Sequence, residues 1–123
     1  MDTAFLWKAD LTAANLASAS LRRVNLREAT LVNANLESSD VSHSDLTGAD
    51  LRGANLLNTN LSNSMLRYAD FSSTKTIIPV STNFTGTNFT NSDLTGSNLT
   101  KAQLKGAILC STKTPWGIDN TNC

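Results

Sequence analysis

A large apolar residue recurs at every fifth position along most of this chain, and that spacing constrains the fold more than any other feature. The series is unbroken from Leu6 to Phe71, and a second series runs from Phe84 to Leu109. Of the seventeen leucines, only Leu57 lies outside the two series. A period of five fits neither an amphipathic α-helix, with apolar residues near i, i+3, i+4 and i+7, nor a strand with unbroken alternation. It predicts a short structural unit repeated many times.

Each unit has the form A(D/N)LXX: a small residue, usually Asp or Asn next, then the large residue and two variable ones. Alternate residues of an extended segment face opposite sides, so the small and large residues point inward together. The variable pair turns a corner, where Asp and Asn are favoured because their side chains bond nearby backbone groups. Four corners close a square coil, so the twenty copies predict about five coils stacked at the ~4.8 Å spacing of parallel strands.

These A(D/N)LXX motifs, which cover residues 4–110, make the chain resemble the pentapeptide-repeat family. The resemblance implies an all-β fold, a right-handed quadrilateral parallel β-helix, in which each coil contacts only its neighbours in the stack. It implies no single function, because members of the family share the rod and differ in role.

The repeat is interrupted between Phe71 and Phe84, where the spacing of large residues is thirteen instead of five. Pro79 lies in this segment and cannot donate a ladder hydrogen bond, so we expect a loop near 72–82 that leaves the coil and rejoins it. Its apolar residues Ile77, Ile78 and Val80 either fold back over the rod or form a hydrophobic contact for a partner. The single domain is thus predicted to comprise a first repeat block (4–71), an interrupting loop (72–81), a second repeat block (82–110) and a C-terminal cap (111–123).

Residues twenty apart are expected to stack in columns on one face. One column holds Trp7, Arg27, Thr47 and Arg67, flanked by Lys8, Glu28, Gly48 and Tyr68. Arg27 is expected over the Trp7 ring and Lys8 beside Glu28. This column is either a solvated ladder or, since Trp, Tyr and Arg anchor many interfaces, part of a protein-binding patch. The candidate binding surface therefore comprises Trp7, Arg27, Arg67, Tyr68, Ile77, Ile78 and Val80.

Two further columns concern hydrogen bonding and charge. Asn15, Asn35 and Asn55 are expected to form a ladder of side-chain amides. Asp50 and Asp70 are expected to be adjacent, with like charge.

The two ends of the rod need covering, because an open coil exposes its core and unpaired strands. At the C-terminal end, 115–117 is predicted to turn and present Trp116 to the last coil. Cys110 and Cys123 either close a loop worth ~3 kcal/mol or remain free thiols, as in cytosolic proteins. Similar tails with a Cys after the last repeat and a closing Cys occur in bacterial, including cyanobacterial, members of the family that the chain resembles. At the other end, Met1, Phe5 and Trp7 cover the first coil or meet another chain.

The composition argues against several classes of function. Ten basic and ten acidic residues give zero formal net charge, which removes the simplest argument for a nucleic-acid or acidic-membrane partner. The sole histidine, His43, is expected to face outward, far from both cysteines, so we predict no metal site, no cofactor and no catalytic group.

The predicted function is therefore a non-enzymatic structural or protein-interaction module. We expect a protein partner of unknown identity, no nucleic acid, no membrane, and a monomer or weak dimer through the poorly capped N-terminal end. The alternative, implied by the resemblance, is a DNA-mimicking protein that binds and protects gyrase, of the fluoroquinolone-resistance type. No apolar run approaches the ~20 residues of a membrane span. The location is predicted to be cytoplasmic if Met1 is the native start, or the periplasm or thylakoid lumen if a targeting segment was removed.

Overall fold

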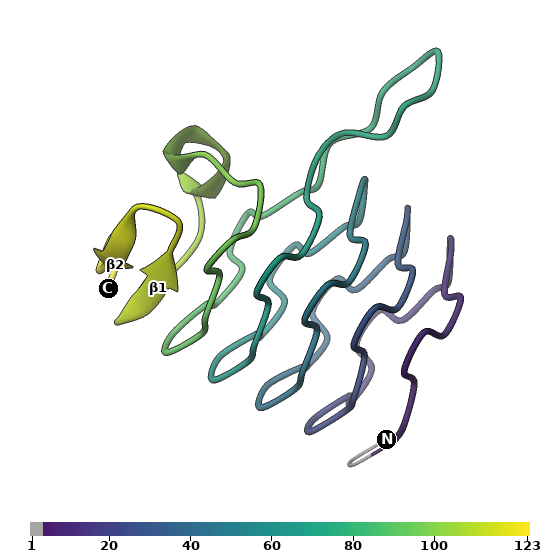
Figure 1. Cartoon of the computed structure of the whole chain (residues 1–123), viewed down its shortest axis with the longest axis horizontal. Helices are drawn as coiled ribbons and strands as arrows, with labels where there is room; N and C mark the ends of the chain where they lie inside the picture. The colour runs from purple at the N-terminus through teal and green to yellow at the C-terminus, as the bar shows by residue number, and fades with distance from the viewer. Residues whose placement is uncertain (1–3) are drawn as a thin grey trace.

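The computed structural model describes residues 4–123 as a rod of stacked four-sided coils (Figure 1). Successive coils are joined by parallel bridges between residues twenty apart, such as Asn15 with Asn35 and Asn35 with Asn55. The predicted right-handed quadrilateral β-helix is confirmed. Met1, which was expected to help cover the first coil, lies outside the described residues.

The core is a single column of large and small side chains running along the rod axis. Leu26, Leu46 and Leu66, spaced twenty apart, are all buried, and each is preceded by a buried residue at the small position. Burying one leucine contributes ~1.5–3 kcal/mol, so this column supplies the main driving force for folding. Leu6 and Leu11, in the first coil, are only partly buried, because coils stack on one side of them alone.

Serine and threonine replace alanine at several of the small core positions, and each hydroxyl is paired. The Oγ1 of Thr59 donates to the carbonyl of Leu36 at 2.8 Å, and the Oγ of Ser64 donates to that of Val41 at 2.9 Å. Within residues 4–123, every buried side-chain nitrogen or oxygen has a hydrogen-bond partner. The shaft therefore accepts a hydroxyl without the cost of an unsatisfied polar group.

Each regular corner is a tight turn closed from both sides. In one example, the N–H of Ala14 donates to the carbonyl of Leu11 at 3.0 Å. The Oδ1 of Asp10 meanwhile accepts the N–H of Thr12 at 3.0 Å, as expected of Asp and Asn before a corner. The same bond to the residue two positions on is made by Asn15, Asn25, Asn35, Asp40, Asp45, Asp50, Asn55, Asn60, Asp70, Asn83, Asn88 and Asp93.

The interruption leaves the stack in register. Asn55 donates to Asn35 across a separation of 20, whereas Asn83 donates to Asn55 across a separation of 28. The predicted amide ladder is thus formed between Asn35 and Asn55, and it continues to Asn83. The separation returns to twenty in the next coil, where Asn88 bridges Ile108.

The second repeat block is less regular than the repeat predicts. The 3-10 helix η1 (Lys101–Leu104) replaces one side, and Ala102, which was expected to point inward, is exposed. The residue before Leu104 is Gln103 where the motif has Asp or Asn. Its longer side chain reaches back, and Oε1 accepts the N–H of Thr100 at 2.8 Å. This bond favours a helical turn over a corner, although Leu104 stays buried.

The C-terminal segment folds as a short antiparallel hairpin, β1 (Thr112–Thr114) and β2 (Gly117–Asp119). β1 also continues the coil stack, since Lys113 bridges Asp93 in parallel. Thr112 and Thr114 are buried as the small and large residues of one further side. The sequence signal for this side was the five-residue step from Leu109 to Thr114, which was missed because threonine is not a large apolar residue.

The corners generate a prediction that reverses the usual effect of glycine. Ala13, the second residue of its corner, is exposed and has a φ of 57°, in the left-handed region that disfavours side chains. Ala17, the first residue of the next corner, is also exposed but does not have a positive φ. We expect Ala13→Gly to raise the free energy of unfolding by about 0.5–1 kcal/mol, because the strain relieved exceeds the added flexibility of the unfolded chain. The matched control Ala17→Gly is expected to lower it. Urea unfolding measures both; a loss of stability in Ala13→Gly would contradict the prediction.

Candidate functional site

The loop over 72–81 projects from one corner of the rod (Figure 1). Ile77 and Ile78 are the most exposed part of its apolar run, with relative exposures of 102% and 80%, and Val80 is less exposed at 44%. Of the two interpretations of this run, folding back over the rod is therefore not adopted by Ile77 and Ile78. We call these two residues the loop tip.

The loop is held in a defined shape by its own hydrogen bonds. The N–H of Thr74 donates to the carbonyl of Val80 at 2.9 Å, and the N–H of Val80 donates to Oγ1 of Thr74 at 2.8 Å. Nearer the tip, Oγ1 of Thr76 donates to the carbonyl of Ile78 at 2.7 Å. These bonds close the loop in the manner of a hairpin, so the tip is presented on an ordered stem.

The base of the loop packs against a corner of the preceding coil. A Cβ atom at Gly53 would lie 2.9 Å from Cγ2 of Thr74 and 3.4 Å from Cβ of Val80. Gly53 also has a φ of +67°, so glycine meets both the conformational and the spatial demand there. Thr74 is buried as a result, and Val80 belongs to the base more than to the tip.

The column of aromatic and charged residues is largely satisfied by internal contacts. Lys8 pairs with Glu28 at 3.5 Å, as predicted, and the Nζ of Lys8 lies 4.8 Å from the centroid of the Trp7 ring. The expected contact of Arg27 with Trp7 is wrong, because Arg27 instead bonds Oδ2 of Asp45 at 3.2 Å. A full carboxylate charge attracts a guanidinium more strongly than an aromatic quadrupole does at an exposed site.

The other end of this column contains a second pair. The guanidinium of Arg67 lies 5.6 Å from the centroid of the Tyr68 ring. Tyr68 lies so close to Gly96 that a Cβ there would be 2.4 Å from the ring. The aromatic residues thus form two separate clusters, with Thr47 and Gly48 of the intervening coil between them.

Arg52, which the sequence analysis did not single out, offsets the repulsion between the like charges of Asp50 and Asp70. Arg52 bonds both oxygens of Asp50, at 2.8 and 2.6 Å, and lies 3.7 Å from Asp70. Burial acts to raise the pKa of Asp70, but hydrogen bonds from Ser72 and Asn98, with the charge of Arg52, bring the pKa below its ordinary value. Arg52 could have been identified from the sequence, because it lies two residues after Asp50 and therefore on the corner next to Asp70 of the following coil.

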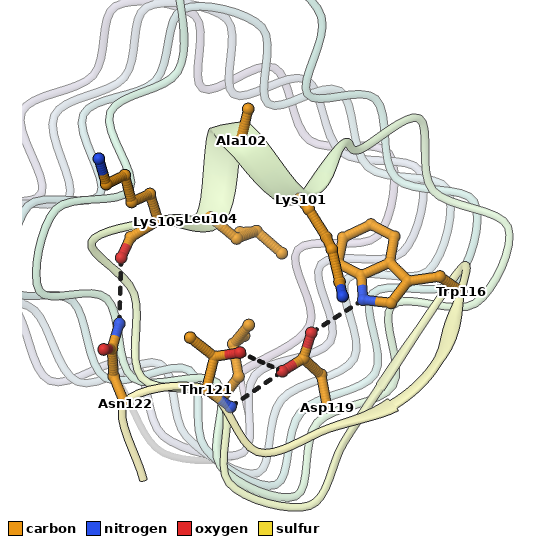
Figure 2. Close-up of a pocket in the computed structure, with 9 residues that line it drawn as sticks. Lys101, Ala102, Leu104, Lys105, Trp116, Asp119, Thr121 and Asn122 are labelled. Atoms are coloured by element: carbon orange, nitrogen blue, oxygen red, sulfur yellow. Dashed lines mark hydrogen bonds between the residues drawn. The ribbon is translucent and has the colours of Figure 1, made fainter.

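The C-terminal cap is organised around Asp119 (Figure 2). Its Oδ2 accepts the indole N–H of Trp116 at 2.8 Å, and its Oδ1 accepts both the backbone N–H and the hydroxyl of Thr121. Bonds from the Thr121 hydroxyl and the Trp116 indole lower the pKa of Asp119 to about 2, against a small opposing effect of burial. Trp116 packs against the core, which confirms the turn predicted at 115–117.

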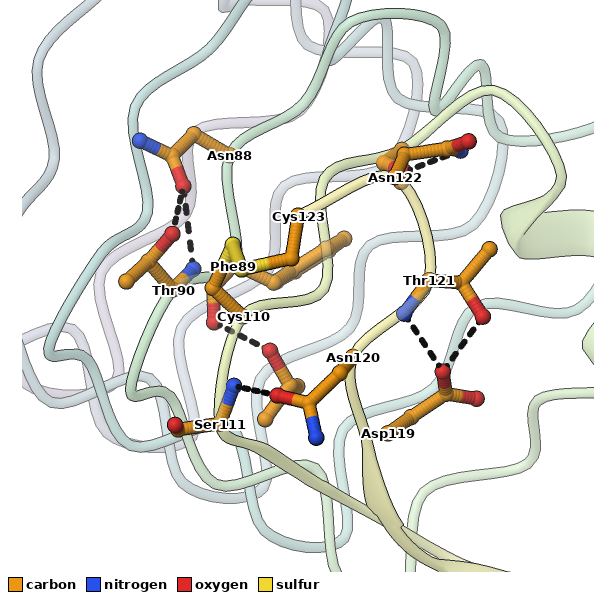
Figure 3. Close-up of a disulfide and its surroundings, with 12 residues drawn as sticks. Asn88, Phe89, Thr90, Cys110, Ser111, Asp119, Asn120, Thr121, Asn122 and Cys123 are labelled. Atoms are coloured by element: carbon orange, nitrogen blue, oxygen red, sulfur yellow. Dashed lines mark hydrogen bonds between the residues drawn. A yellow bond between two sulfur atoms is a disulfide. The ribbon is translucent and has the colours of Figure 1, made fainter.

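A disulfide joins Cys110 to Cys123, with their Cα atoms 5.0 Å apart (Figure 3). The tail that carries Cys123 runs back along the last coil, where the N–H of Leu109 donates to the carbonyl of Thr121 at 2.9 Å. The amide of Asn122 donates to the carbonyl of Ala107 at 2.9 Å. Of the two alternatives left open for the cysteines, the structure contains the bonded one.

The described part of the chain supplies little that points to catalysis. His43 is exposed at a corner. In residues 4–123 no three His, Cys, Asp or Glu side chains lie close enough to hold a metal ion. Over the same residues, no helix is long and apolar enough to cross a membrane.

Comparison with known proteins identifies the family. Residues 9–48, 44–75 and 81–113 match the family of pentapeptide repeats, in eight copies. The chain belongs to the pentapeptide-repeat family.

Among solved structures, the chain is similar to HetL from the cyanobacterium Nostoc sp. strain PCC 7120, with 28% identity over 92% of this chain and a TM-score of 0.54. It is also similar to alr5209 from Nostoc PCC 7120, with 26% identity over 76% of this chain and a TM-score of 0.54. The chain spans 65% and 66% of the lengths of these two proteins. A search of curated proteins gave no match.

The disulfide makes a prediction about the cap. Closing a loop of 13 residues is expected to stabilise the native state by about 3 kcal/mol. Replacing both cysteines by serine should therefore lower the free energy of unfolding and expose the amides of 109–123 to hydrogen exchange, while the amides of 26–66 stay protected. Mass spectrometry before and after reduction checks the bond itself. Equal exchange of the cap with and without the cysteines would contradict the prediction.

The pKa of Asp119 makes a prediction about acid stability. Because its pKa is lower in the folded state than the ordinary value of 3.8, the unfolded chain takes up a proton first. The stabilisation by Asp119 is then complete above pH ~4 and is lost as the pH falls toward 2. Urea unfolding between pH 2 and 6 should show this fall in the free energy of unfolding. The Asp119→Asn variant should be less stable at pH 6 and should lose less stability as the pH falls. An equal fall in both proteins would contradict the assignment to Asp119.

Proposed function

We propose that this chain is a non-enzymatic protein-interaction module and that the loop tip is its principal contact. The observation that supports this proposal is the near-complete exposure of Ile77 and Ile78 on an ordered, projecting stem. Large apolar side chains held in water at the end of a structured element, with polar neighbours, are typical of interaction sites.

Simple energetics support a contact at the tip. Burying an isoleucine side chain contributes ~1.5–3 kcal/mol, so the two together supply a substantial part of a binding free energy. The bonds between Thr74 and Val80 already order the stem. The conformational entropy lost on binding is reduced accordingly.

The shape and charge of the loop indicate the kind of partner. A narrow wedge of two β-branched side chains fits a concave apolar cleft better than a flat surface. Lys75, which is exposed two residues before Ile77, adds one positive charge beside the wedge. We therefore expect a protein partner with an apolar cleft and an acidic group on its rim.

The column that contains Trp7, Arg27, Arg67 and Tyr68 is assigned a secondary role. Its cations are engaged with Glu28, Asp45 and the neighbouring rings. These contacts support the interpretation as a surface ladder, and participation of the column in binding stays a prediction.

One of the similar proteins, HetL, supports a regulatory role without defining it. HetL is described as involved in the regulation of heterocyst differentiation, and this chain covers 65% of it. Several carboxylates of this chain are paired with arginines, namely Asp40 with Arg22, Asp45 with Arg27 and Asp50 with Arg52. That pairing, with zero net charge, gives no support to the gyrase-protecting alternative, which requires an acidic surface.

The disulfide bears on the expected location. Disulfides persist in oxidising compartments and are rare in the cytosol. The Cys110–Cys123 bond favours the periplasm or thylakoid lumen over the cytoplasm within the proposal. Dimerisation through the N-terminal end stays a prediction.

The test compares the loop tip with an exposed apolar residue elsewhere on the surface. Ile77→Asp combined with Ile78→Asp should leave the melting temperature unchanged, because neither side chain packs against the rod, but abolish co-purification of partners from the native host. The control Ile118→Asp alters an apolar residue on β2 that is 62% exposed, and it should retain them. If the tip variant recovers the same proteins as the wild type, the loop tip is not the contact.

A further inference from the structure

The C-terminal end of the rod contains a pocket of about 460 Å³ that the loop tip does not involve. Its apolar lining comprises Leu104, Leu109 and the indole of Trp116, while Lys101 and Lys105 also line it (Figure 2). The volume is within the ~300–1,000 Å³ range of small-molecule sites.

The pocket follows from the irregular last coil. η1 occupies the side where a regular corner and strand would lie, and the indole of Trp116 lies beside its Lys101 end (Figure 2). The third wall is the tail at Thr121 and Asn122, which the disulfide and the bond from Asn122 to the carbonyl of Ala107 hold in place. The cavity is therefore preformed by three tethered segments.

The charges around the pocket favour an anion. Lys101 and Lys105 are both exposed, and Asp119 is the one acidic residue that lines the cavity within residues 4–123. The ammonium of Lys101 points toward Asp119, and that of Lys105 points away from the cavity (Figure 2). Asp119 is buried, and its two oxygens already accept bonds from Trp116 and Thr121. A cationic ligand would have to break those bonds and approach two lysines, so a cation is disfavoured.

We propose that this pocket binds a small amphipathic organic anion, an aromatic or aliphatic group that carries a carboxylate or sulfonate. The apolar group packs on Leu104, Leu109 and Trp116, and the anionic group lies at the mouth, where Lys101 meets it directly and the exposed Lys105 meets it after a change of side-chain rotamer. The same chemistry is offered by a free organic acid and by the carboxy-terminal residue of a peptide, and the experiment below separates the two.

The first measurement uses the fluorescent anion 8-anilinonaphthalene-1-sulfonate. In a Trp7→Phe background Trp116 is the remaining tryptophan, so energy transfer from the indole is strongest for dye bound in the pocket. We expect saturable binding with one site per chain, weakened by salt. The uncharged analogue N-phenyl-1-naphthylamine should bind at least several-fold more weakly. Equal affinity for the two dyes would overturn the proposal, because the anionic group would then contribute nothing.

The second measurement uses paired lysine variants. Lys101→Gln combined with Lys105→Gln should weaken binding about tenfold, as expected for the loss of two exposed ion pairs. Both residues are exposed, so folding should be retained, which circular dichroism checks. The control pair Lys75→Gln and Lys113→Gln removes the same charge from exposed positions that do not line the pocket. An equal loss in both pairs would show a nonspecific effect of net charge and overturn the site.

Competition then assigns the source of the ligand. 4-Phenylbutyrate represents free organic acids, and the peptide acetyl-Gly-Gly-Leu with a free carboxylate represents a chain end. Displacement of the dye by either one supports the site and indicates its ligand class. The amidated peptide should not displace it. Failure of both carboxylates to displace the dye at millimolar concentration would overturn the proposal.

Discussion

Every side of the coil has to place one large and one small side chain in a shaft that three other sides also fill. This packing constraint explains why the small position accepts Ala, Ser and Thr, and why its hydroxyls bond carbonyls of the coil wall, as Thr59 bonds Leu36. Near the interruption, larger side chains gather. The rings of Phe71 and Phe84 have centroids 5.2 Å apart, and those of Phe84 and Phe89 lie 6.1 Å apart. Their volume fills the shaft where the chain leaves and re-enters it.

The packing constraint does not extend to the surface, because the side chain of the Asp or Asn before each corner accepts the backbone N–H that the turn leaves unpaired. The backbone N–H of the first corner residue is bonded whatever side chain that residue carries, as Thr12, Ala17 and Arg27 show. Corner residues can therefore vary in charge and size with little effect on the core. Arg27, for example, uses its corner position to form an ion pair with Asp45 of the next coil.

The sequence predicted the coil, its core and the position of the loop because these depend on the spacing of side-chain volumes alone. It did not predict the direction taken by Ile77 and Ile78, since folding back requires an apolar surface that the polar exterior of the rod does not offer. Arg27 and Trp7 lie in one column, which predicted their contact, but Asp45 in the neighbouring column competes for the guanidinium and binds it. The predicted inward position of Ala102 is wrong for a different reason. Gln103 has one methylene more than Asn, so the Gln103 side chain reaches the N–H of Thr100 instead of the N–H two residues further on.

The return of the stack to register after the loop has a consequence for how such proteins diversify. Asn83 takes the place above Asn55 that residue 75 would hold in an unbroken series, and the strands on either side pair as before. The loop and the stack are thus structurally independent: the protruding element can be lengthened, exchanged or deleted by changes at a single bend. Grafting a foreign peptide between Ser73 and Ser81 would exploit the same independence in an engineered scaffold.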